Sequence, residues 1–346
     1  MESQQAQRKN EHLSLAVKMW RQQQLKVIGA PFEAVRWVPN SLPELGENDI
    51  TLNQTISGLN FSWPFYIEAM TGGSNYTKEI NGQLAQVASE TGIAMAVGSQ
   101  SIAIKDRQVT DSFKIVRQAN PNGIVIANLG ANHPLDHVLQ AVDMLEANAL
   151  EMHVNVAQEL SMAEGDRTFY WLDNLANIIA KSPVPVIIKE VGFGMGTSSI
   201  QQIAALEPAA INIGGTNGTN FATIEQARDL KNSNPIDFSH YGFSTIESLL
   251  AAQKAQISIP IIATGGITKP NDIITSLILG ATLTSSAGYF LSTLVTQGPT
   301  GLYQTITDWQ KALPKFMLAL GVRQVNELRA VPRIYNSDLQ NFIHQL

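Results

Sequence analysis

The chain has 346 residues, of which 44% are hydrophobic and 15% charged, and its formal net charge is −6 at neutral pH. This composition excludes a disordered chain, and without a block of basic residues it does not suggest a nucleic-acid-binding protein. Cysteine is absent, which excludes disulfides, thiolate metal sites and a cysteine nucleophile. The polar start lacks the apolar core of an export signal, and no apolar run approaches the roughly 20 residues that cross a bilayer. We therefore expect a cytoplasmic protein without a membrane partner.

An amphipathic helix is predicted near the N-terminus, with one apolar face formed by Leu13, Ala16, Val17 and Trp20. Arg8, Lys9 and His12 stand in front of it. Basic residues in the first turn of a helix oppose the macrodipole at a cost of about 0.3–1 kcal/mol each, and a locally unfavourable choice points to function. A guanidinium fork, an ammonium and an imidazole suit a clamp for a diphosphate. The alternative is a solvated, frayed terminus.

Eight short apolar runs follow, at 65–70, 93–97, 123–127, 149–154, 184–191, 209–213, 259–263 and 281–286. Helical patterns separate most of them, and several lack polar alternation, which is typical of strands covered on both faces. Eight such units predict an α/β protein with a (β/α)8 TIM barrel rather than an open doubly wound sheet. We predict a single domain over 1–346, with an N-terminal extension at 1–60, the barrel core at 61–300 and a C-terminal helical segment at 301–346.

Glycine or small polar residues end nearly every run. In a barrel these ends meet at the C-terminal face, where such enzymes place their chemistry. A single glycine turn is more simply explained by tight chain reversal, but the full set predicts a site. The last two ends, Thr264-Gly265-Gly266 and Ser286-Ala287-Gly288, match the place where barrels commonly bind a phosphate on exposed backbone N–H groups.

Lys189 lies within an otherwise buried strand, where an unpaired ammonium would cost several kcal/mol. One explanation is a structural pair with a neighbouring carboxylate. The other is an anionic ligand, and a lysine at this position suits the N1/O2 edge of a reduced flavin. Asn128 and Ser99 would then hydrogen-bond the ring, with Thr71 beside them. The sequence permits FMN at this point but does not demonstrate it.

The fourth run ends in His153-Val154-Asn155, followed by Gln158 and Glu159. His153 and Asn155 point to the same side of the strand. Glu159 is a candidate Mg²⁺ ligand, because Mg²⁺ is commonly bound by one or two carboxylates together with substrate phosphates and water. The alternatives are a solvated carboxylate in a first helical turn for Glu159 and a hydrogen-bonded core residue for His153. The long loop after the sixth run, 216–242, is a candidate lid, in which Tyr241 could equally be a packing residue.

Taken in order, the motifs of this chain resemble those of the type 2 isopentenyl-diphosphate Δ-isomerases, which are FMN-dependent barrel enzymes. The motifs are Arg8-Lys9-x-x-His12, Met70-Thr71-Gly72-Gly73, Val97-Gly98-Ser99-Gln100, Asn155-x-x-Gln158-Glu159, Lys189-Glu190-Val191-Gly192-Phe193-Gly194 and Gly218-Thr219-Asn220-Phe221. The resemblance implies interconversion of isopentenyl and dimethylallyl diphosphate on reduced FMN with Mg²⁺, with NADPH as reductant and without net redox change. It also implies a homo-oligomer, a tetramer or octamer.

The resemblance assigns residues by group. Gln158, His153 and Lys189 would be catalytic. Arg8, Lys9, His12, Ser99, Gln100, Ser101, Asn155 and Gln158 would bind the substrate. Met70, Thr71, Gly72, Ser99, Asn128, Lys189, Gly214, Thr219, Gly265, Gly266, Ile267, Ala287 and Gly288 would bind FMN, and Glu159 would hold Mg²⁺. The chain departs from the family pattern at Asn217, where a glycine or small residue is usual, and at Tyr241, where a tryptophan is common.

Two other functions fit part of the pattern. An FMN-dependent 2-hydroxy-acid oxidase or dehydrogenase uses a histidine base and an arginine after a late strand, but the corresponding segment here, 214–219, has neither. A non-catalytic flavin-binding protein would have no use for Glu159 or for Arg8 and Lys9.

Overall fold

The computed structural model describes residues 4–21, 28–162, 164–228, 236–238 and 240–346. Within helices α1 and α9 the side chains of residues 4–9, 12, 21, 226 and 228 also lie outside the description. None of the described helices is long and apolar enough to cross a membrane.

The eight predicted strands form a closed parallel barrel. They are β4 (Phe65–Ile67), β5 (Met95–Ala96), β6 (Val125–Gly130), β7 (Ala149–Val154), β8 (Val186–Glu190), β9 (Ala210–Asn212), β10 (Ile261–Thr264) and β11 (Leu283–Ser286). Neighbours in sequence pair in parallel, and β11 closes the ring against β4, with Thr284 opposite Phe65. The (β/α)8 barrel expected from the sequence is confirmed.

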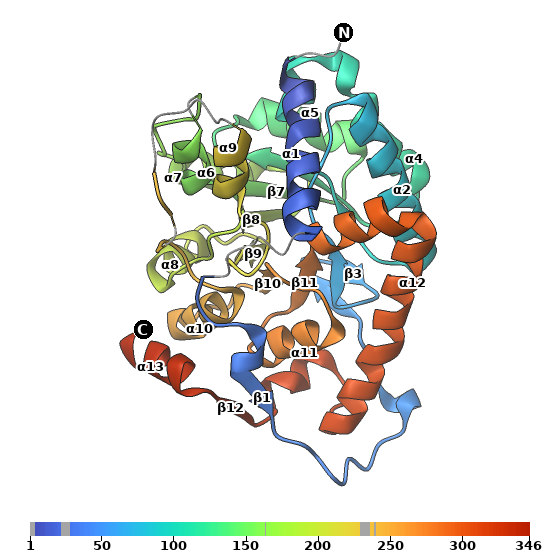
Figure 1. The fold of residues 1–346 in the computed structure, drawn as a ribbon, viewed down its shortest axis with the longest axis vertical. Coiled ribbons are helices and arrows are strands. Elements are labelled where there is room, and N and C mark those ends of the chain that lie inside the picture. Colours follow the sequence, from blue (N-terminus) through green and yellow to red (C-terminus); the bar gives the residue numbers. More distant parts are fainter. Residues whose placement is uncertain (1–3, 22–27, 163, 229–235, 239) are drawn as a thin grey trace.

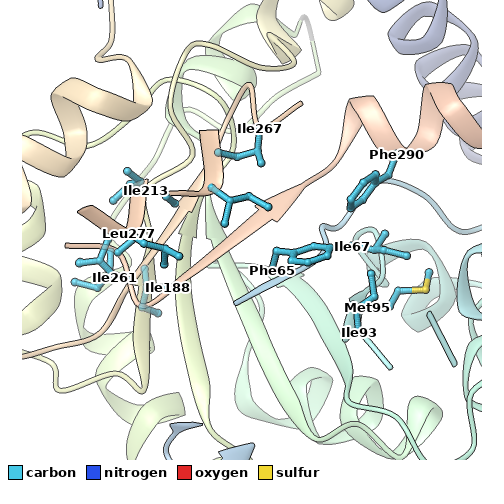
Figure 2. Packing of buried hydrophobic residues seen from close by; sticks show 14 of the residues in the cluster. Phe65, Ile67, Ile93, Met95, Ile188, Ile213, Ile261, Ile267, Leu277 and Phe290 are labelled. Atoms are coloured by element: carbon cyan, nitrogen blue, oxygen red, sulfur yellow. The ribbon is translucent and has the colours of Figure 1, made fainter. Parts of the chain in front are cut away.

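Helices surround the strands (Figure 1). They are α2 (Asn75–Thr91), α4 (Asp111–Ala119), α5 (Leu135–Leu145), α7 (Leu172–Lys181), α8 (Thr197–Ala204), α10 (Thr245–Ala255), α11 (Pro270–Ile278) and α12 (Gly288–Leu320), the last kinked at Gly298. Three further short helices, α3 (Ser101–Lys105), α6 (Val156–Ser161) and α9 (Phe221–Arg228), follow strand ends. The outward faces of the strands pack on the helices through a continuous apolar layer, of which Phe65, Ile188 and Phe290 are members (Figure 2).

The barrel interior has two layers of side chains with opposite character. The lower layer is apolar apart from the tyrosine hydroxyl and consists of Tyr66, Ala96, Ile126, Ala149, Ile187, Ala210, Ile262 and Leu283, one from each strand or its end. Because strand side chains alternate between faces, the residue two positions later also points inward. Those residues form the upper layer, which is polar apart from Gly98: Glu68, Gly98, Asn128, Glu151, Lys189, Asn212, Thr264 and Ser285. The upper layer therefore forms the floor of any binding site at the C-terminal face of the barrel.

A hairpin of β2 (Gln54–Ile56) and β3 (Leu59–Phe61) closes the opposite end of the barrel. Ile56 and Phe61 pack into the lower layer, and the ring of Phe61 lies 6.4 Å from that of Tyr66. Nothing in our sequence analysis predicted this hairpin.

An antiparallel pair joins a segment that precedes the barrel to one that follows it. β1 (Val35–Trp37) pairs with β12 (Arg333–Tyr335), and α13 (Ser337–Gln345) follows. Short 3-10 turns at Phe32–Ala34, Glu47–Asp49 and Val325–Ala330 connect these segments. The C-terminal segment therefore contains a strand as well as helices.

The predicted N-terminal helix is α1 (Gln4–Arg21), whose apolar face packs against α9 and α12. It begins earlier than we expected. Arg8, Lys9 and His12 lie inside the helix rather than in front of it, so the argument from unfavourable first-turn charges does not apply to them. Their side chains lie outside the described part of the structure.

Candidate active site

Two adjoining cavities open at the C-terminal ends of the strands. The larger has a volume of about 350 Å³ and the smaller about 40 Å³, and Met70 and Lys189 line both. α1 covers them: Leu13 and Ala16 line the larger cavity, and Trp20 lines the smaller. The ring of strand ends inferred from the sequence therefore encloses a real space beneath the N-terminal helix.

The smaller cavity is a cradle of backbone at the ends of β9, β10 and β11. Gly265 and Gly266 have φ of +111° and +73°, which L side chains rarely adopt. A Cβ on Gly265 would overlap the carbonyl oxygen of Gly215, and a Cβ on Gly288 would lie 2.8 Å from the hydroxyl of Thr219. Because α12 begins at Gly288, its unpaired N–H groups and the positive end of its dipole face this cavity. The geometry suits a phosphate group.

Besides Met70 and Lys189, seven residues that the resemblance assigns to FMN line the smaller cavity. They are Gly214, Thr219, Gly265, Gly266, Ile267, Ala287 and Gly288.

The larger cavity gathers the polar residues predicted for the rest of the site. Met70, Ser99, Ser101, Asn128, His153, Asn155, Gln158, Glu159 and Lys189 line it. Three other predicted residues lie behind its wall. Gln100 is buried, with its amide donating to the carbonyl of Ala141 (2.9 Å) and accepting from the N–H of Asn128 (3.0 Å). Thr71 and Gly72 pack under the end of β4, and the Thr71 hydroxyl is buried without a hydrogen-bond partner among the described residues.

The end of β7 carries a chain of polar side chains. Asn155 donates to Glu159 (Nδ2 to Oε1, 2.8 Å), whose other oxygen accepts from the backbone N–H of Asp166 (2.8 Å). Gln158 donates to Glu225 of α9 (Nε2 to Oε1, 3.2 Å). We did not predict Glu225, although a carboxylate in the helical part of the candidate lid loop was a usable signal. No group of three metal-ligating His, Asp or Glu side chains occurs in the described parts of the chain.

Lys189 is paired with a carboxylate in the barrel floor. Its Nζ lies 3.5 Å from Oε1 of Glu68, and the side chains are 8% and 1% exposed. The structural pair left open by the sequence is therefore present, and the same lysine also lines both cavities. Burial acts to raise the pKa of Glu68, but the charge of Lys189 and hydrogen bonds outweigh it, so the pKa of Glu68 is lowered.

A second carboxylate, Glu151, completes this floor. The hydroxyl of Tyr66 lies 3.2 Å from Oε2 of Glu68 and 3.0 Å from Oε1 of Glu151. Burial and the neighbouring charge of Glu68 raise the pKa of Glu151 well above its ordinary value. We missed both glutamates, although each is a charged residue in an apolar run, the same signal that identified Lys189.

The floor also fixes the orientation of His153. Asn128 donates to Glu151 through Nδ2 (3.0 Å), so its carbonyl oxygen can only accept. That oxygen lies 3.0 Å from Nδ1 of His153, which must therefore carry a proton. In the neutral ring Nε2 is then the unprotonated nitrogen.

A hydroxyl–imidazole relay forms another part of the wall. Ser99 and Ser101 are 2.8 Å apart (Oγ to Oγ), Ser101 lies 2.7 Å from Nε2 of His133, and the Nδ1 atoms of His133 and His137 are 2.8 Å apart. Burial and the nearby positive charges of His137 and Lys105 lower the pKa of His133 to about 4, which keeps it neutral at pH 7. His133 was absent from our predictions, although it lies shortly after the glycine that ends β6.

The two departures from the family pattern have local explanations. Asn217 accepts from the N–H of Thr245 (2.7 Å) and donates to the carbonyl of Ala30 (3.3 Å), so it ties the start of α10 to the N-terminal segment. Tyr241 packs its ring against Phe193 and Phe238, at 5.8 and 5.3 Å, while remaining half exposed. Tyr241 is therefore a packing residue of this loop. Residues 229–235 of the same loop lie outside the described part of the structure.

Solved structures share this fold at low sequence identity. A mandelate oxidase variant with an FMN adduct has a TM-score of 0.64 at 15% identity, covering 88% of this chain and 89% of its own. A flavocytochrome b2 variant with pyruvate bound has a TM-score of 0.66 at 18% identity, covering 89% and 78%. These likenesses concern the barrel alone.

Sequence comparisons are more specific. The family model for FMN-dependent dehydrogenase matches residues 135–333. The isopentenyl-diphosphate delta-isomerase of Lactococcus lactis is 47% identical over 98% of this chain and 96% of its own length. That of Limosilactobacillus reuteri (strain JCM 1112) is 45% identical over 100% and 99%. Combined with a closed barrel and a glycine-lined cavity at the ends of its last strands, these identities show that the chain belongs to the isopentenyl-diphosphate delta-isomerase family.

Proposed function

We propose that this protein interconverts isopentenyl and dimethylallyl diphosphate by an allylic 1,3-proton shift on reduced FMN with Mg²⁺. The main observation in support is that a glycine-lined cradle suited to a phosphate adjoins a polar cavity. One buried lysine, Lys189, lines both. The reaction adds a proton at one carbon of the allylic unit and removes one from another, so it has no net redox change.

The residues present fit FMN. The cradle at Gly265, Gly266 and Gly288 admits no Cβ, which leaves backbone N–H groups for a phosphate. Met70, Ser99, Asn128 and Lys189 would line the ring, and the unpartnered hydroxyl of Thr71 lies beside them. When bound and reduced, FMN supplies the group that exchanges protons with the substrate. Lys189 would stabilise negative charge there, and NADPH is our candidate reductant.

The chain's own residues then bind and orient the C5 diphosphate. Ser99, Ser101, Asn155 and Gln158 line the larger cavity and would contact the substrate. Gln100 would act indirectly, because its amide holds the backbone of Asn128. Arg8, Lys9 and His12 of α1 would add positive charge around the diphosphate.

His153 and Gln158 are our candidates for positioning protons at the reacting carbons. His153 is held as the Nδ1–H tautomer by Asn128, which leaves Nε2 as an acceptor. Gln158 is oriented by its hydrogen bond to Glu225 of α9.

Glu159 would hold Mg²⁺ together with oxygens of the diphosphate, since it lines the cavity and only one oxygen of a carboxylate needs to reach the ion. We expect Glu159→Gln to lower kcat/KM by about 10–100-fold at low Mg²⁺, with partial recovery as Mg²⁺ is raised. Glu164→Gln, at the same cavity wall, is the control and should retain the wild-type Mg²⁺ dependence. Full activity of Glu159→Gln at low Mg²⁺ would remove the residue from the metal site.

The function itself is tested by anaerobic turnover of isopentenyl diphosphate with FMN, Mg²⁺ and NADPH or dithionite, each omitted in turn. We expect dimethylallyl diphosphate only when the flavin is reduced and Mg²⁺ is present. Tight FMN binding without isomerisation would contradict the proposed substrate but would remain consistent with FMN as the cofactor. Oxidation of a 2-hydroxy acid such as lactate would then be assayed, although the segment after β9, 214–219, offers neither histidine nor arginine for it.

Assembly and compartment remain predictions. We propose a homotetramer or homo-octamer in the cytoplasm. Light scattering coupled to size-exclusion chromatography measures the first, and a dimer or monomer at micromolar concentration would contradict it.

A further inference from the structure

Two carboxylates in the barrel floor share one tyrosine hydroxyl. Glu68 and Glu151 are 1% and 0% exposed, and Oη of Tyr66 lies 3.2 Å from the first and 3.0 Å from the second. They stand in the same polar layer as Lys189, directly beneath the proposed flavin site.

The two carboxylates receive different numbers of donors. Glu68 accepts from the N–H of Ala69 (2.8 Å), from Asn212 Nδ2 (2.7 Å) and from Ser285 Oγ (2.6 Å), and it faces Lys189. Apart from the shared tyrosine, the described residues provide Glu151 with one hydrogen-bond donor, Asn128 Nδ2 at 3.0 Å. A carboxylate that only accepts is therefore favoured at Glu68, and a neutral acid that also donates is favoured at Glu151.

Proton counting shows that one of the two carboxyl groups must carry a proton, and the donors just described place it on Glu151. The hydroxyl of Tyr66 has a single hydrogen and contacts both carboxyl groups. If both glutamates were ionised, one of these contacts would set lone pairs against lone pairs. One proton on Glu151 resolves this, because Glu151 then donates to Tyr66 and Tyr66 donates to Glu68. The raised pKa of Tyr66, which follows from burial and from these two acidic neighbours, keeps the phenol protonated.

We propose that Glu68, and not Glu151, is the charged carboxylate of the floor, and that it sets the reduction equilibrium of the bound flavin by compensating Lys189. This inference rests on the proposed binding of FMN. Glu68 is a positioning residue, since it acts through the lysine. Reduction makes a flavin more negative, so an uncompensated ammonium would favour the reduced form. The negative charge of Glu68 reduces this stabilisation of the reduced form by Lys189. The other charges near Lys189 are Glu151, which is neutral in this assignment, and Glu190 on the same strand.

The test compares two variants that differ by one charge. Glu151→Gln replaces a neutral acid by a neutral amide, and Glu68→Gln/Glu151→Gln removes the charge as well. The double variant is needed because Glu151 alone beside Lys189 would ionise once Glu68 was neutral. The readout is the midpoint potential of bound FMN, measured by anaerobic dye equilibration, with the Kd of oxidised FMN as a check of the site.

We expect the reduction equilibrium of FMN bound to Glu151→Gln to stay within threefold of the wild-type value. The double variant should shift that equilibrium at least tenfold toward reduced FMN, which is about 30 mV for two electrons. Equal potentials in the double variant and the wild type, with FMN bound in both, would overturn the inference. An equal shift in both variants would overturn the assignment of the charge to Glu68. Failure of the wild type to bind FMN would instead refute the proposed function.

A second measurement needs neither flavin nor a folded double variant. The infrared spectrum of the wild type should contain the C=O band of a buried protonated carboxylic acid, which Glu151→Gln should lack. If the band is unaffected by that substitution, the proton does not reside on Glu151.

Discussion

Lys189→Met is expected to lower the free energy of unfolding by about 3–5 kcal/mol at pH 8, because it leaves the buried carboxylate of Glu68 without its cation. Methionine keeps most of the aliphatic stem, so lost packing contributes little. Urea unfolding followed by circular dichroism measures the change, and flavin content should fall in the same variant.

The loss should depend on pH in a stated direction. In the wild type the pKa of Glu68 is lowered, so its ionised form contributes stability above the ordinary value of 4.5 and that contribution is lost as the pH falls through the lowered pKa. Without the charge of Lys189, only hydrogen bonds oppose the effect of burial, and we expect the pKa of Glu68 to rise. Stability is then lost as the pH increases through the raised pKa, and the deficit of the variant should shrink toward pH 5.

The control is Lys189→Met combined with Glu68→Gln, in which neither partner is charged. Neutral replacement of a whole buried pair is often tolerated, so we expect most of the lost stability to return. A double variant no more stable than Lys189→Met would show that the pair is not the source of the loss.

Gly265→Ala is expected to raise the Kd for FMN by about tenfold or more and to lower stability by about 1–3 kcal/mol. Gly265 has φ of +111°, and a Cβ there would overlap the backbone oxygen of Gly215, which no side-chain rotation can relieve. The phosphate cradle must therefore deform. Fluorescence titration with FMN and thermal unfolding of the flavin-free protein measure the two effects.

Gly58→Ala provides a matched control in the turn between β2 and β3. Its φ is +82°, yet a Cβ would meet nothing within 4 Å. We expect it to lose some stability through backbone strain while binding FMN as the wild type does. If the two variants bind FMN equally well, the cradle is not the phosphate site.

Strand positions and strand ends could be read from the sequence because both depend on local chemistry. Buried parallel strands are continuous apolar runs, and turns with positive φ at strand ends favour glycine, as at Gly265 and Gly266. The lysine of the floor was visible for the same reason, since a charge inside an apolar run stands out.

What could not be read was which side chains meet. Glu68 and Glu151 are 83 positions apart, and only closure of the barrel brings both to the hydroxyl of Tyr66. The pairing of β1 with β12 and the wall position of His133 likewise depend on contacts between distant segments. The expectation that Gln100 contacts substrate rested on its place in a motif, and its side chain points into the protein interior instead.

The pairing of β1 with β12 has a consequence for how the protein is made. Val35 pairs with Tyr335, 300 residues further along the chain, and Phe65 of β4 pairs with Thr284 of β11, 219 residues further along. At a synthesis rate of about 5–20 residues per second, the partner of Val35 leaves the ribosome about 15–60 seconds after it. Until β11 has been synthesised, the open edge of β4 is available to other chains, which makes the growing polypeptide a candidate for chaperone protection. β12 follows β11 in the chain, so the pair of β1 and β12 can form only after every strand of the ring has been synthesised.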